Sequence, residues 1–106
     1  MNEPLTDPYS LFLFGLNSPV TRDRYSTRLR WFFSNIGIVE IPMEERCSFF
    51  VDKAKKDPNW AIHEILKFLQ TYKIRYDRRE IAGSTIRNYV KVVKLLCEQN
   101  DLGHIL

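Results

Sequence analysis

The sequence is poor in the residues that build disulfide scaffolds, metal centres and flexible linkers. Its 106 residues include only two cysteines, two histidines and four glycines. Structural zinc needs four clustered ligands, and Cys47, Cys97, His63 and His104 are isolated in the sequence, so we expect neither a metal site nor a cofactor. Two lone cysteines are typical of buried thiols in a reducing compartment, and we therefore expect a cytoplasmic protein.

Long apolar runs are also missing. The segment at 11–14 is apolar but far shorter than the roughly 20 residues that cross a bilayer. No basic region precedes it and no small-residue cleavage site follows it, so we expect neither a signal peptide nor a membrane partner. The 44% hydrophobic and 27% charged content instead fits one globular domain.

Catalytic motifs are absent as well. The sequence has no glycine-rich phosphate loop and no Gly-x-Ser-x-Gly motif. Neither histidine has a nucleophile or a carboxylate at a telling spacing, and the adjacent Glu44 and Glu45 fit a solvated helix start better than an acid–base pair. We therefore expect that this chain is not an enzyme.

Positive charge, in contrast, is concentrated in two segments of a chain whose net charge is only +3. Residues 19–37 carry four arginines against one aspartate, and residues 67–94 carry eight lysines or arginines against Asp77 and Glu80. This clustering favours a polyanion as the partner. Charged helix faces that simply meet water would give the same pattern, so charge alone leaves both interpretations open.

Capping signals and helical spacing of apolar residues predict an all-α fold, a compact bundle of four or five helices. Ser18 and Asp57 each precede a proline, a residue suited to the first helical position, and they start helices expected at 19–36 and 58–74. Gly37 suits the left-handed residue after the first of these helices. Two more helices are expected at about 43–56 and 85–100, the last one capped by Ser84.

The segments outside these four helices are expected to be less regular. Residues 1–16 form an N-terminal lead-in, in which Tyr9–Leu16 packs as a short turn or as the fifth helix. Residues 75–83 lack helical periodicity and form a nine-residue basic connector. That connector is too long for the turn of a helix-turn-helix motif, which argues against a regulator of that class.

Two polar stripes on the expected helices are candidate binding surfaces. The first stripe consists of Arg24, Arg28, Trp31 and Asn35. The second consists of Arg87, Lys91, Lys94 and Glu98, with Thr85 and Asn88 beside it. A helix start such as that at Ser84 can hold a phosphate, and outward Arg and Asn side chains can contact base edges. Trp31 is either solvated or packed against a second side of the core, and both stripes also fit solvated helix faces.

Three sequence segments resemble a known family. They are SPVTRDRY at 18–25, EIAGSTIRNY at 80–89 and LLCEQND at 95–101. In this order and spacing they are similar to the SAM-like core-binding domain of tyrosine recombinases, especially archaeal and phage-type integrases. The resemblance covers residues 17–102, nearly the whole chain.

The resemblance implies a module that forms one half of a clamp around double-stranded DNA. The other half would be a C-terminal catalytic domain of the same protein, which carries the tyrosine nucleophile and would follow residues 103–106, the start of a linker. The family implies a homo-oligomer on DNA as a further partner. Tyr25, Tyr72 and Tyr89 would then be core or rim aromatics and not the nucleophile.

The resemblance also implies which residues contact DNA. Carried over by position, these are Thr21, Arg22, Arg24, Arg28, Ser84, Thr85, Arg87, Asn88 and Lys91, with Arg75, Arg78 and Arg79 adding backbone contacts. The charge stripe adds Lys94, a position at which the family pattern does not fix a basic residue. The alternative is a helical protein–protein interaction module that mediates assembly without binding DNA.

Overall fold

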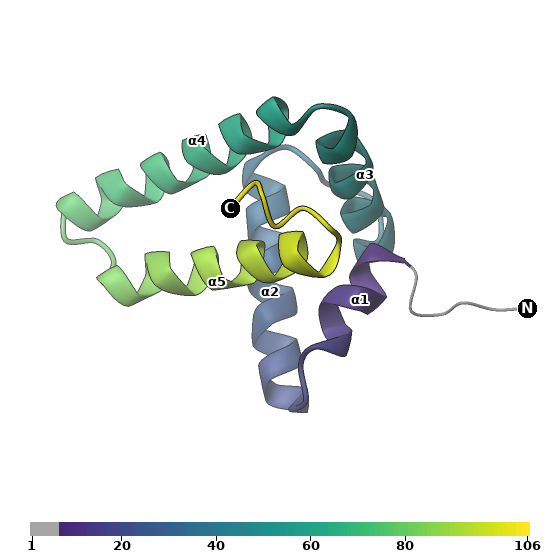
Figure 1. Ribbon diagram of the computed structural model, residues 1–106. Coiled ribbons are helices and arrows are strands. Elements are labelled where there is room, and N and C mark those ends of the chain that lie inside the picture. The colour runs from purple at the N-terminus through teal and green to yellow at the C-terminus, as the bar shows by residue number, and fades with distance from the viewer. Residues whose placement is uncertain (1–6) are drawn as a thin grey trace, which may run out of the picture.

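The structure, a computed structural model, describes residues 7–106 and is entirely helical apart from turns and loops over that range. Its elements are α1 (Pro8–Phe14), α2 (Pro19–Asn35), α3 (Met43–Lys56), α4 (Pro58–Asp77) and α5 (Gly83–Gln99), as Figure 1 shows. The expected all-α fold is confirmed, and the short N-terminal helix is its fifth member. The lead-in expected over 1–16 begins with six residues that lie outside the described part of the chain.

Three helices begin with the same local device, a polar cap followed by proline. The cap oxygen accepts a hydrogen bond from the backbone N–H three residues later, in the pairs Asp7–Ser10 (3.1 Å), Ser18–Thr21 (3.4 Å) and Asp57–Trp60 (3.2 Å). The proline fills the first helical position, where no N–H donor is needed. The caps expected at Ser18 and Asp57 are confirmed, and Asp7 carries the same signal for α1.

Three helices also end alike, with one residue in the left-handed region. These residues are Gly37 after α2 (φ 86°), Arg79 after α4 (φ 62°) and Asp101 after α5 (φ 61°). In each case the residue after the left-handed one donates its backbone N–H to the carbonyl five residues before it. These hydrogen bonds, at 2.7–2.9 Å, join Ile38 to Phe33, Glu80 to Arg75 and Leu102 to Cys97. This double-turn closure satisfies the last carbonyls of the helix, and it confirms the role expected for Gly37.

The connector before α5 is shorter than the sequence suggested. α4 continues to Asp77, whose carboxylate pairs with Lys73 one turn earlier at 2.6 Å, so the connection spans only 78–82. The expected nine-residue connector at 75–83 is therefore wrong. The helix persists because this i, i+4 ion pair and the left-handed Arg79 close its last turn.

The start of α5 also differs from the expectation. Ala82 is the cap residue, no side chain caps the helix, and the predicted cap at Ser84 is wrong because Ser84 already lies inside α5. Ile81 and Ile86, which flank the first turn, both pack against the core. An apolar pair at these two positions fixes where the chain enters a helix, and here it outweighs the local preference of serine for a cap.

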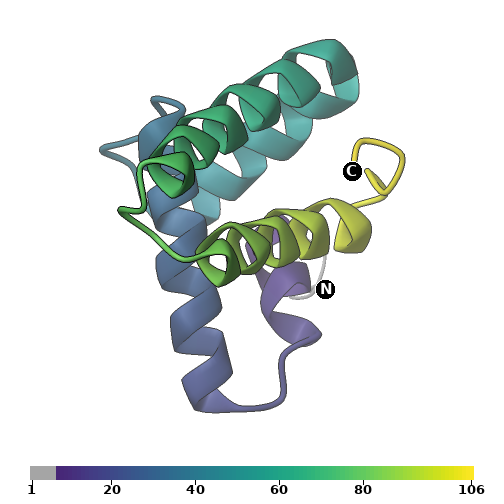
Figure 2. The same cartoon turned by 90° about the vertical axis from the view of Figure 1, so that its left-hand side faces the viewer.

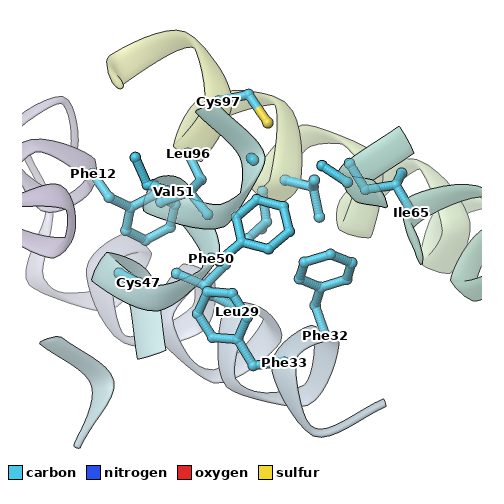
Figure 3. Packing of buried hydrophobic residues seen from close by; sticks show 14 of the residues in the cluster. Phe12, Leu29, Phe32, Phe33, Cys47, Phe50, Val51, Ile65, Leu96 and Cys97 are labelled. Carbon is cyan, nitrogen blue, oxygen red and sulfur yellow. The ribbon is translucent and has the colours of Figure 1, made fainter. Parts of the chain in front are cut away.

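The core lies where the five helices meet, and aromatic rings dominate it. Phe12, Phe32, Phe33 and Phe50 are fully buried, and Figure 3 shows these rings clustered with Leu29 and Leu96. A row of ring contacts at 4.8–5.9 Å continues through Phe68 to Tyr72 and Tyr89. The row joins α2, α3, α4 and α5 into one packing unit.

The chain ends contribute to the same core. Phe12 brings α1 against α3 and α5, and the amide of the buried Asn100 donates to the Pro8 carbonyl (3.4 Å) and to the Leu96 carbonyl (2.9 Å). In residues 103–106, the segment expected to start a linker, Ile105 is buried against the core. Within residues 7–106, no helix combines the length and the apolar character that crossing a membrane requires.

Candidate nucleic-acid interface

The outer stripe of α2 faces solvent. Arg24 and Asn35 are exposed, Arg28 is half-buried, and Trp31 keeps 57% of its surface exposed. The alternative in which Trp31 covers a second side of the core is therefore excluded. The Asn35 amide donates to the Trp31 carbonyl at 2.8 Å, so it helps to close the end of the helix.

Two of the nominated residues at the start of α2 have structural roles. The Arg22 Nε donates to the Leu16 carbonyl at 2.7 Å and holds the α1–α2 loop against the helix. The Thr21 N–H is bound by the Ser18 cap, and the Thr21 side chain is half-buried. The start of α2 is thus fixed, and it orients the stripe that follows.

Two nominated arginines from different helices influence the tyrosines at the end of the aromatic row. The Arg75 guanidinium lies 5.2 Å from the centroid of the Tyr72 ring, and the Tyr72 and Tyr89 rings are 5.0 Å apart. Burial and the hydrogen bond with Tyr72 raise the pKa of Tyr89, and the positive charges of Arg28 and Arg75 partly offset this. Arg28 of α2 and Arg75 of α4 therefore lie near one site on α5.

Further along α5, two lysines face the start of α2. Lys91 and Lys94 are exposed, and with Tyr25 of α2 and Leu16 of the preceding loop they border one shallow depression. Figure 2 shows α5 passing across α2 on this side. The lysines of α5 therefore lie beside the first turns of α2.

The tip of the α4–α5 pair carries the remaining nominated residues. Arg78, Arg79, Ser84 and Arg87 are exposed there, whereas Thr85 and Asn88 are half-buried. Because no side chain caps α5, the backbone N–H groups of Gly83 and Ser84 remain available for an anion, whereas that of Thr85 donates to the Ala82 carbonyl at 3.0 Å.

Ion pairing separates the cations of this region into two groups. Three of them pair with acids, in the pairs Lys67–Glu64 (3.5 Å), Lys73–Asp77 (2.6 Å) and Arg75–Glu80 (3.5 Å). Apart from Arg22, which donates to the Leu16 carbonyl, seven of the nominated cations form no ion pair within residues 7–106, and together we call them the basic surface: Arg24, Arg28, Arg78, Arg79, Arg87, Lys91 and Lys94. Unpaired cations drawn from three neighbouring elements are well suited to hold a polyanion.

A second surface, on the α2–α3 loop and α3, was not predicted from the sequence. Val39, Ile41 and Phe49 are 43%, 37% and 48% exposed and border one depression, and we call them the apolar patch. In α3, Phe49 directly precedes the fully buried Phe50. The 100° step between adjacent helical residues turns Phe49 outward when Phe50 is buried, so the spacing itself held the signal.

Neither a metal site nor a reactive thiol is found among residues 7–106. Within residues 7–106, no group of three or more metal-binding side chains comes together. Cys47 and Cys97 are buried free thiols, and burial raises the pKa of Cys97 to about 11 and that of Cys47 further. Both thiols are therefore protonated at neutral pH, in contrast to reactive cysteines, which are ionised.

Comparison with known proteins adds no relative. No family model, no curated protein and no solved structure matches the chain. The functional interpretation therefore depends on the residues and on their geometry.

Proposed function

We propose that this chain is the DNA-binding, core-binding domain of a site-specific tyrosine recombinase or integrase, and that it clamps double-stranded DNA through the basic surface. The observation that carries the proposal is the basic surface, in which seven nominated cations without ion pairs lie on α2, α5 and the connector between α4 and α5. Residues 18–25 and 80–89, which carry the sequence resemblance, lie within or beside these elements.

Binding of this kind is dominated by phosphate contacts. Each phosphate that an Arg or Lys neutralises releases a counterion, so the logarithm of affinity falls with the logarithm of salt at a slope of about −0.9 per contact. The uncapped start of α5, with Ser84 and Arg87 exposed beside it, supplies a further place for one phosphate. About five to eight contacts would give the isolated domain micromolar or weaker affinity at physiological salt.

Under this proposal the chain positions DNA and does not cut it. Tyr72 and Tyr89 are buried in the aromatic row, and the raised pKa of Tyr89 keeps its hydroxyl protonated. Such a group is poorly suited to act as a nucleophile. The catalytic tyrosine would belong to a separate catalytic domain of the same protein, which would form the other half of the clamp.

The connector at 78–82 is close in length to the turn of a helix-turn-helix motif, so its length no longer argues strongly against a regulator of that class. In that motif the second helix crosses the first at about 90–120°. In this chain α5 folds back beside α4 in the opposite direction, as the two views in Figures 1 and 2 show. The pair is therefore a helical hairpin, which argues against a helix-turn-helix regulator.

One observation favours a second function, a protein–protein interaction module. The apolar patch exposes three large hydrophobic side chains next to one another, an arrangement common at protein interfaces. The patch and the basic surface occupy different elements, so assembly and DNA binding are compatible. A pure interaction module would bind no DNA with a steep dependence on salt.

The test is fluorescence anisotropy of a labelled DNA duplex titrated with the chain at low salt. Because charge-assisted hydrogen bonds are lost, we expect Arg87→Ala and Arg28→Ala each to weaken binding about tenfold. Urea unfolding of both variants checks that the fold is kept, which matters most for the half-buried Arg28. Unchanged affinity in both variants would contradict the assignment of the basic surface.

A further inference from the structure

The two tryptophans of the chain are in opposite situations. Trp60 is half-buried, with its ring 5.5 Å from that of Phe50 and with the Lys53 ammonium 4.6 Å above it. Trp31 lies on the outer stripe of α2 and is 57% exposed. Trp31 therefore offers a ring that a ligand can cover, whereas the ring of Trp60 is already in contact with Phe50 and Lys53.

The charges around Trp31 specify the chemistry of that ligand. Arg24 and Arg28 precede Trp31 by two turns and one turn on the same stripe, about 10 Å and 5 Å away along the helix axis. Neither arginine forms an ion pair within residues 7–106. Asp23 is the one acidic residue of α2, and its position lies off this stripe.

This arrangement is complementary to a nucleotide strand, because the planar ring can stack on a base while the two cations bind the phosphates beside it. Proteins that hold unpaired nucleic acid combine a basic track along the backbone with aromatic rings that stack on bases. The bases inside a duplex are already stacked on each other, so an indole on a helix surface gains such a contact only from a base that has left the stack. An apolar peptide could cover the Trp31 ring, but it would leave the two arginines without a partner.

We propose that Trp31 is a base-stacking site for unpaired DNA, with Arg24 and Arg28 holding the adjoining phosphates. This deepens the proposed function and rests on it, because it adds recognition of a strand with a displaced base to the grip on the duplex. The site lies on the outer face of α2, one turn beyond Arg28, which approaches the Tyr72–Tyr89 pair. The stripe thus leads from two cations of the basic surface to Trp31.

The experiment uses the intact chain, a short oligothymidine strand and a fully paired duplex of equal length. Tryptophan emission is followed during each titration, since stacking of a base quenches an indole. We expect oligothymidine to quench the wild type and to leave Trp31→Phe unquenched, because the remaining emission comes from the shielded Trp60. We expect Trp31→Leu to bind oligothymidine about tenfold more weakly, and Trp31→Phe to recover part of that loss because it keeps a π face.

The duplex titration distinguishes failure of this inference from failure of the proposed function. Trp31→Leu should bind the duplex with wild-type affinity, since Arg24 and Arg28 are unchanged. Duplex binding that persists while oligothymidine neither quenches Trp31 nor discriminates Trp31→Leu would overturn the stacking site alone. If the wild type binds neither nucleic acid, both proposals are overturned. A concentration-dependent blue shift of Trp31 emission without DNA would assign Trp31 to a protein interface instead.

Discussion

α3 and α5 are both amphipathic and both carry several cations, yet they use them differently. On α3, Glu44 and Glu45 lie in the first turn and three lysines lie in the last, an order that complements the helix dipole. On α5, neither end is charged in this way, and Arg87, Lys91 and Lys94 run along its middle. The charges of α3 therefore stabilise its own helix, whereas those of α5 do little for α5 and are left for a partner.

The largest predicted effect concerns the aromatic row that joins these two helices. Phe50→Ala removes a fully buried ring that contacts Phe32, Phe33 and Trp60, and we expect it to lower the free energy of unfolding by about 3–5 kcal/mol. The matched control is its neighbour Phe49→Ala, which removes an exposed ring and should cost less than about 1 kcal/mol. Urea unfolding measures both, and equal losses would contradict the assigned orientation of α3.

These adjacent phenylalanines also show how far sequence reasoning reaches. Helix positions followed from periodicity and from the Ser18 and Asp57 caps, because these are local signals. The burial of Phe50 instead of Phe49 depends on which side of α3 meets α2, which is a tertiary property. The same Asp-Pro signal precedes α1 at Asp7, but a helix of seven residues is too short to show a clear periodicity.

The candidate site was predictable in part for the same reason. The stripe on α2 and the lysines of α5 followed from the 100° helical step, but their proximity depends on how α5 crosses α2. The uncapped start of α5 could not be inferred from Ser84, because Ile81 and Ile86 fix that start through packing. The apolar patch could not be predicted, because Val39 and Ile41 lie in a loop, where no periodicity indicates exposure.

A smaller effect is expected at Arg79 and Asp101, where the strain of a positive φ can be distinguished from the contribution of the side-chain charge to DNA binding. Arg79→Gly and Asp101→Gly each replace a side chain at positive φ with glycine, and we expect each to raise the free energy of unfolding by up to about 1 kcal/mol. Only Arg79→Gly should also weaken duplex binding, because Arg79 belongs to the basic surface. Equal DNA affinity in the two variants, measured by anisotropy, would remove Arg79 from that surface.

An effect of similar size concerns the Asp7 cap of α1. The hydrogen bond from Ser10 lowers the pKa of Asp7 below the ordinary 3.8, so the carboxylate stabilises the fold above that value and loses its effect as pH falls through the lowered pKa. Asp7→Ala should cost about 1 kcal/mol at neutral pH. Asp7→Asn keeps a cap acceptor without titrating, so only the wild type should lose this contribution in acid, as urea unfolding across pH would show.

The most direct test of the central claim compares how duplex affinity depends on salt when charge is removed from α5 or from α3. The double variant Arg87→Ala/Lys91→Ala should bind more weakly than the wild type and flatten the log–log slope by about 1.8, or 0.9 per lost contact. The matched double variant Lys55→Ala/Lys56→Ala removes the same charge from α3 and should keep the wild-type slope. Equal slopes for all three proteins, or no binding even at low salt, would contradict the account and leave the apolar patch as the better guide to function.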